Sequence, residues 1–120
     1  MNTAQTGVLG EELAAKNYQH KGFLLLARNF KARTGEIDLV ALKQNVLVFV
    51  EVKTRGAGAI ARPKEWVTLQ KQHRIIAAAG AFLQQNPQYA DCLMRFDVVE
   101  VQLNRQQKAT LNQIENAFTL

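Results

Sequence analysis

The sequence predicts an α/β domain in which helices flank a mixed β-sheet, with elements in the order helix, strand, strand, strand, helix, strand. Two observations lead to this class. Two segments carry apolar residues at helical spacing, and four others alternate in polarity or are rich in β-branched and aromatic residues. No repeat, low-complexity tract or change in composition divides the 120 residues, so we expect a single domain over residues 1–120.

The first helix is expected over residues 7–21, where apolar residues recur at helical spacing and Gly22 supplies a stop. On this helix Glu12 is expected to pair with Lys16, because residues four apart are neighbours on a helix surface. Glu11 falls at the edge of the apolar arc. It should therefore face inward or toward a cleft, in a different environment from Glu12.

Four segments are expected to be strands: residues 23–30, 36–42, 46–53 and 94–103. Turns at residues 31–35 and 43–45 would join the first three. In the second of these strands the period of two predicts that Ile37, Leu39 and Ala41 share one face and that Asp38 lies on the other. The third is the strongest strand, because it is rich in Val and Phe.

The remaining segments are a loop, a second helix and a tail. The loop is expected at residues 56–61, which include two glycines. The second helix is expected to begin near Pro63 and to end at Asn86 and Pro87, since proline suits a first helical turn and interrupts a later one. The tail, residues 104–120, fits either a short packed helix or a late strand.

Composition favours a cytoplasmic protein that binds polyanions. The chain has 15 Lys and Arg against 10 Asp and Glu, a net charge of +5, so nucleic acid is the natural partner. Cys92 is the only cysteine and cannot form an internal bridge, and His20 and His73 lack the spacing of zinc ligands. No apolar run reaches the length of a membrane span, and the first residues lack the pattern of a signal peptide, so no membrane association is expected.

Asp38, Glu51 and Lys53 form the constellation that points to chemistry. Glu51 and Lys53 must share a face because side chains alternate along a strand, and a hairpin around residues 43–45 would bring Asp38 opposite Glu51. Two carboxylates meet the minimum that Mg²⁺ (or Mn²⁺) needs when waters and substrate phosphate complete its shell. Lys53 would orient a metal-bound water or stabilise transition-state charge, and Glu11 would complete the ligand set or hold a metal-bound water.

Several short motifs in order strengthen this hypothesis. They are Gly-Glu-x-x-Ala at 10–14, Arg-Asn at 28–29, Gly-Glu-Ile-Asp-Leu at 35–39, Phe-Val-Glu-Val-Lys-x-Arg at 49–55, a helix lysine at 71 and Arg-Phe-Asp-Val-Val at 95–99. Together they resemble the YraN family of predicted endonucleases, which is similar to archaeal Holliday-junction resolvases of the PD-(D/E)xK superfamily. The resemblance spans residues 7 to about 101.

This resemblance implies a restriction-endonuclease-like core and carries catalytic roles onto Asp38, Glu51 and Lys53, with Glu11 as the acid on the helix. Asp38, Glu51 and Glu11 would be the metal ligands. Glu36 also matches the family motif, and a role as a plain strand-edge acid is equally compatible with its position. Because the junction-cutting relatives act as dimers, a homodimer is also implied.

Three basic residues are candidates for nucleic-acid contacts. Arg55 lies two residues beyond Lys53 on the same strand face, and Arg74 lies on the polar side of the second helix. Lys71 sits at the centre of that helix's apolar face, so it either covers apolar surface with its stem or reaches toward the metal cleft. Arg95 and Asp97 are expected to form a structural ion pair, and Tyr18 and Trp66 to be core residues rather than base-stacking platforms.

The function expected from the sequence is therefore a metal-dependent endonuclease that hydrolyses phosphodiester bonds of DNA or branched nucleic acid. The alternative is a non-catalytic nucleic-acid-binding or adaptor protein that retains a nuclease fold.

Overall fold

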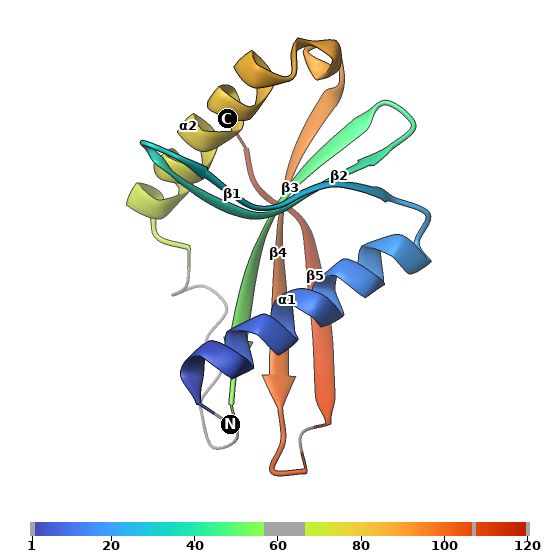
Figure 1. Cartoon of the computed structure of the whole chain (residues 1–120), viewed down its shortest axis with the longest axis vertical. Coiled ribbons are helices and arrows are strands. Elements are labelled where there is room, and N and C mark those ends of the chain that lie inside the picture. Colours follow the sequence, from blue (N-terminus) through green and yellow to red (C-terminus); the bar gives the residue numbers. More distant parts are fainter. Residues whose placement is uncertain (1, 57–66, 107, 120) are drawn as a thin grey trace.

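The computed structural model of the chain describes residues 2–56, 67–106 and 108–119. Within these ranges a twisted five-stranded sheet lies between two helices (Figure 1). The helices are α1 (Thr3–His20) and α2 (Leu69–Gln85), and a short 3-10 turn, η2 (Pro87–Tyr89), follows α2. The strands are β1 (Leu24–Ala32), β2 (Gly35–Lys43), β3 (Val46–Arg55), β4 (Leu93–Leu103) and β5 (Ala109–Phe118).

The strands lie in chain order across the sheet, β1-β2-β3-β4-β5. Only β3 and β4 are parallel; every other neighbouring pair is antiparallel. Parallel neighbours require a crossover, and α2 lies in the connection between β3 and β4, whereas short turns suffice for the antiparallel pairs. The predicted α/β class and its element order are thus confirmed.

Apolar clusters occupy both faces of the sheet. On one face Ala14 and Tyr18 of α1 pack with Val50 of β3, and on the other Phe82 of α2 packs with Phe49. The central strand β3 is buried on both sides, which is why it reads in the sequence as an almost continuous apolar run. None of the helices in the described part of the chain is long and apolar enough to cross a bilayer.

Both helices begin at positions that differ from the sequence expectation. Helix α1 starts at Thr3 because Asn2 and Gln5 form a reciprocal cap, in which each side chain accepts a hydrogen bond from the other's backbone N–H. Helix α2 starts at Leu69 after Thr68, whose side chain accepts a hydrogen bond from the backbone N–H of Lys71. The expected start at Pro63 lies outside the described residues, as does most of the expected loop at 56–61, whereas the end before Asn86 is confirmed.

The tail forms a strand, one of its two expected structures. Strand β5 pairs antiparallel with β4 and is anchored by the buried carboxylate of Asp97. This carboxylate accepts hydrogen bonds from the backbone N–H of Asn116 and the side chain of Gln113, both on β5. It also accepts from the Tyr18 hydroxyl at 2.7 Å and from Arg95, so the expected structural ion pair between Arg95 and Asp97 is confirmed.

The expectation that Ile37 shares a face with Leu39 and Ala41 is wrong. Ile37 packs in the cluster beneath α2, whereas Leu39 and Ala41 pack beneath α1. The strand changes face at Asp38, where the pairing with β1 skips from Leu39 to Ile37 and the opposite residue, Asn29, has a positive φ of 51°. The regular alternation is interrupted at the residue predicted to bind a metal.

Candidate functional site

Strands β2 and β3 separate at the position of the two predicted acids. Their pairing runs from Lys43 and Val46 to Leu39 and Val50, and Asp38 and Glu51 occupy the next positions along the two strands. In place of a backbone partner, the N–H of Val52 donates to Asp38 Oδ2 at 2.7 Å. The Asp38 side chain is therefore held across the opening between the strands.

Glu51 is the buried acid of this site, with its side chain only 9% exposed. Its Oε1 atom lies 2.7 Å from Lys71 Nζ and 3.4 Å from Lys53 Nζ. Lys53 comes from the same face of β3, as the alternation of side chains requires, and Lys71 comes from the first turn of α2. Of the two roles open to Lys71, the structure therefore supports the one in which it reaches the cleft.

Burial and like charge perturb these groups. The pKa of Asp38 is raised to about 7 by burial, then by the charges of Glu51 and Glu11, against the opposing hydrogen bond from Val52. Burial and the adjacent Lys71 lower the pKa of Lys53. Burial also acts to lower the pKa of Lys71, but its contact with Glu51 outweighs this, and the net shift is upward. The site thus holds a carboxyl that titrates near neutrality.

Asp38, Glu51 and Lys71 line a pocket of about 420 Å³, with Glu36 and Arg74 also in its wall. Gly35 closes one side. A Cβ at this position would lie 2.8 Å from the backbone oxygen of Arg74, so only glycine lets the start of β2 approach α2 this closely. This contact explains why a glycine precedes Glu36 in the motif.

Helix α1 approaches the same region through Gly10, where a Cβ would overlap the side chain of Thr54 on β3. The close approach brings the charge of Glu11 near enough to raise the pKa of Asp38. Even so, within residues 2–56, 67–106 and 108–119 no three His, Cys, Asp or Glu side chains group closely enough to hold a metal ion. Asp38 and Glu51 are brought together, and Glu11 acts on Asp38 through its charge.

The donor set fits a hard divalent ion that keeps most of its waters. Asp38 uses Oδ2 for Val52, and Glu51 uses Oε1 for the two lysines, so each carboxylate has a second oxygen for an oxygen-preferring ion. A neutral Asp38 is a poor ligand, so binding of such an ion would displace its proton.

Other predicted residues lie outside this pocket. Arg55 is at the end of β3, beyond Lys53, and Tyr18 is a fully buried core residue, as expected. Trp66 lies outside the described residues. The expected pairing of Glu12 with Lys16 is wrong, because the Glu12 carboxylate lies 2.7 Å from Arg28 of β1. A partner on an adjacent strand has replaced the helical neighbour.

Sequence reasoning did not single out Glu100, which lies beside Lys53 in the parallel register of β3 and β4. Its Oε1 atom is buried without a hydrogen-bond partner in the described structure, and burial raises its pKa against a hydrogen bond with Asn112. The alternation of the strand around Arg-Phe-Asp-Val-Val was a usable signal, since it places Glu100 on the face of Phe96 and Val98 rather than that of Asp97.

Fold and site together define an α/β protein with a cleft at the opening between β2 and β3, where two acids lie close together and two lysines contact one of them. Comparison with known proteins gives the particular family: the chain belongs to the uncharacterised protein family UPF0102, whose model matches residues 10–101. It is 40% identical over 119 residues to a UPF0102 protein of Caldicellulosiruptor saccharolyticus, covering 98% of this chain and 100% of the relative. A UPF0102 protein of Alkaliphilus oremlandii is 42% identical over 113 residues, covering 93% and 96%.

Proposed function

We propose that the protein is a metal-dependent phosphodiesterase that cleaves DNA or branched nucleic acid within the cytoplasm. The observation that carries this proposal is that Asp38 and Glu51 line one pocket and that Lys53 lies next to Glu51. The carboxylates come from two separate strands, and the ammonium of Lys53 lies 3.4 Å from Glu51. The resemblance to nucleases noted in the sequence and the net charge of +5 agree with a polyanionic substrate.

Each residue has a chemical task in this scheme. When bound, Mg²⁺ or Mn²⁺ would polarise the phosphoryl oxygen and lower the pKa of a coordinated water. Asp38 and Glu51 would hold that ion, and the nearby negative charge of Glu11 would add to its attraction. Lys53 would orient the attacking water or stabilise the charge that develops on the phosphate. Its lowered pKa makes it a better proton donor than an exposed lysine.

The test is a panel of branched, nicked and single-stranded DNA, incubated with Mg²⁺ or Mn²⁺. We expect cleavage by the wild type and a loss of at least about 100-fold in Lys53→Ala, a loss in the range of general acid–base catalysis, with DNA binding retained. Lys16→Ala is the matched control, because Lys16 is exposed on α1 and its substitution removes the same charge as Lys53→Ala. Cleavage that survives Lys53→Ala would identify a contaminating nuclease.

A non-catalytic nucleic-acid-binding protein is the second candidate, and the ion pair between Lys71 and Glu51 favours it. An ammonium at 2.7 Å already neutralises the buried carboxylate, as a structural ion pair would. This candidate predicts salt-sensitive DNA binding without cleavage on any substrate and without a heat of Mn²⁺ binding in calorimetry.

A further inference from the structure

We propose that a groove between the tip of the β1–β2 hairpin and the outer face of α2 holds the phosphodiester backbone of a nucleic-acid strand as it leaves the cleft. The groove has a volume of about 810 Å³, and Lys31 and Arg33 of the hairpin face Ala77, Gly80 and Gln84 of α2 across it. This inference rests on the proposed function and extends it, since it assigns a path to the substrate.

The groove adjoins the candidate site. Gly35 meets the backbone of Arg74, and the rings of Phe30 and Phe82 lie 5.3 Å apart, so the hairpin runs alongside α2 as Figure 1 shows. Arg74 belongs to the wall of the site pocket, and Ala77, less than one helical turn later, belongs to the groove. A strand entering the groove would therefore pass Arg74 on its way from the cleft.

Positive charge in the groove has no acidic counterpart. Lys31, Arg33 and Arg74 are exposed, and none makes an ion pair with another side chain of the described structure. Glu36 stands opposite Lys31 in the hairpin register without forming one. Among the residues that the structure describes, none that lines the groove is acidic. When unpaired cations of a protein contact phosphates, the counterions condensed on the nucleic acid are released. This release is the main source of affinity for nucleic-acid backbones.

The floor of the groove also leaves room for a backbone. Ala77 and Gly80 are exposed, and a Cβ added at Gly80 would meet nothing within 4 Å. With a helical rise of about 1.5 Å per residue, Gln84 lies about 15 Å beyond Arg74, which is enough for a few nucleotides.

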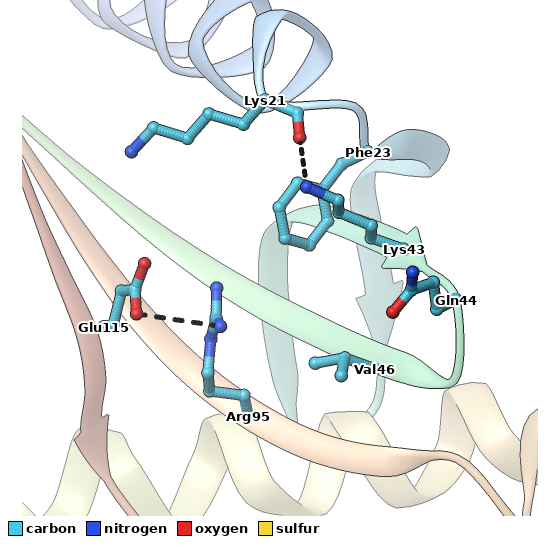
Figure 2. Close-up of a pocket in the computed structure, with 7 residues that line it drawn as sticks. All are labelled: Lys21, Phe23, Lys43, Gln44, Val46, Arg95 and Glu115. Carbon is cyan, nitrogen blue, oxygen red and sulfur yellow. Dashed lines mark hydrogen bonds and ion pairs between the residues drawn. The ribbon is translucent and has the colours of Figure 1, made fainter.

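A second cationic pocket, of about 440 Å³, does not share these properties (Figure 2). There Lys43 Nζ donates to the carbonyl oxygen of Lys21 at the end of α1, and Arg95 is bound by Asp97 and lies 3.8 Å from Glu115. Lys21 donates to a glutamine side chain. These cations already have protein partners, and they lie on the α1 face, away from α2. They therefore provide a matched control.

The experiment compares two double variants of equal charge, Lys31→Gln with Arg33→Gln and Lys21→Gln with Lys43→Gln. Binding of a fluorescent forked DNA is measured by anisotropy over a series of salt concentrations. We expect the groove variant to bind at least about 5-fold more weakly. Its plot of log affinity against log salt should also fall less steeply, with a slope smaller in magnitude by about one to two. The control variant should change the affinity by less than about 2-fold. Equal weakening in both would overturn the proposal, since net charge alone would then explain it.

Gly80 offers an independent test that spares the cations. Gly80→Glu places a carboxylate in open space within the groove, and Gly80→Gln places a neutral side chain of the same size there. We expect Gly80→Glu to weaken DNA binding at least about 5-fold relative to Gly80→Gln, with the same melting temperature in both variants. Equal affinity of the two variants would overturn the proposed path.

The outcome is separable from that of the proposed function, because binding and cleavage are measured apart. A wild type that binds DNA through the groove but never cleaves it would refute the phosphodiesterase and keep the groove. If Lys53→Ala abolishes cleavage but the groove variants leave its KM and kcat unchanged, the phosphodiesterase is kept and the groove is refuted.

Discussion

Replacing Asp38 by Asn is expected to stabilise the metal-free protein at alkaline pH while abolishing metal binding. The pKa of this carboxyl rises from 3.8 to about 7 on folding, mainly through burial and then through the charge of Glu51. The folded protein therefore holds the proton more tightly than the unfolded chain. The stability that this group contributes is complete below about pH 4 and is lost as the pH rises through about 7.

The magnitude follows from the shift. Three pKa units at about 1.4 kcal/mol each set an upper limit of about 4 kcal/mol for ionising Asp38 in the folded protein. Because the side chain is only half-buried, solvent screening reduces this to about 2 kcal/mol. An asparagine keeps the acceptor for the Val52 N–H and carries no charge. The variant should then unfold about 2 kcal/mol less readily than the wild type near pH 8, and the difference should shrink as the pH falls until the two proteins unfold almost equally readily near pH 4.

Urea unfolding at these two pH values, with and without Mn²⁺, measures both effects. Glu36→Gln is the control, since it removes a charge from an exposed residue of the same pocket, and it should change stability by less than about 0.5 kcal/mol. Mn²⁺ should stabilise the wild type and leave the Asp38→Asn variant unchanged. The reasoning fails if the variant is less stable near pH 8, or if the difference between the two proteins does not depend on pH.

Three further substitutions test how the site is built, each by thermal melting. Gly10→Ala drives a Cβ into Thr54 and should cost about 1–3 kcal/mol, whereas Gly80→Ala meets open space and should stabilise the helix by about 0.5–1 kcal/mol. If both alanines have the same effect, the close approach of α1 to β3 is not what requires Gly10. Tyr18→Phe removes the hydroxyl that donates to the buried Asp97 and should cost about 1–3 kcal/mol, an estimate that an unchanged melting temperature would contradict.

Much of the fold is predictable from sequence because local patterns and burial agree. Strand β3 is apolar because it is covered on both faces, and the C-terminal end of α2 and the turn before Val46 coincide with residues that interrupt regular structure. The start of α1 was not predicted, because a cap made by Asn2 and Gln5 extends the helix beyond its apolar pattern.

The parts that sequence reasoning missed depend on contacts between elements. The change of face at Asp38 arises where Asn29 of β1 adopts a positive φ, and no period within residues 36–42 reveals it. Glu12 meets Arg28 only because α1 lies across β1. The approach of Asp38 to Glu51 was predictable, because both acids belong to one hairpin. The choice between two roles for Lys71 was not, because it depends on the position of α2.

The position of Lys71 links the cleft to the groove. Without a metal, two ammonium groups contact the Glu51 carboxylate, and Lys71 makes the shorter contact. On the proposed function, a divalent ion at these carboxylates brings two positive charges into the same pocket, so it competes with Lys71 for Glu51. Lys71 lies about one turn before Arg74 on α2, and Arg74 stands between the cleft and the groove. Once displaced from Glu51, the Lys71 ammonium would be available to a phosphate at the entrance to the groove. Metal binding would then supply a further cation for the substrate backbone, so metal and nucleic acid should each strengthen the binding of the other.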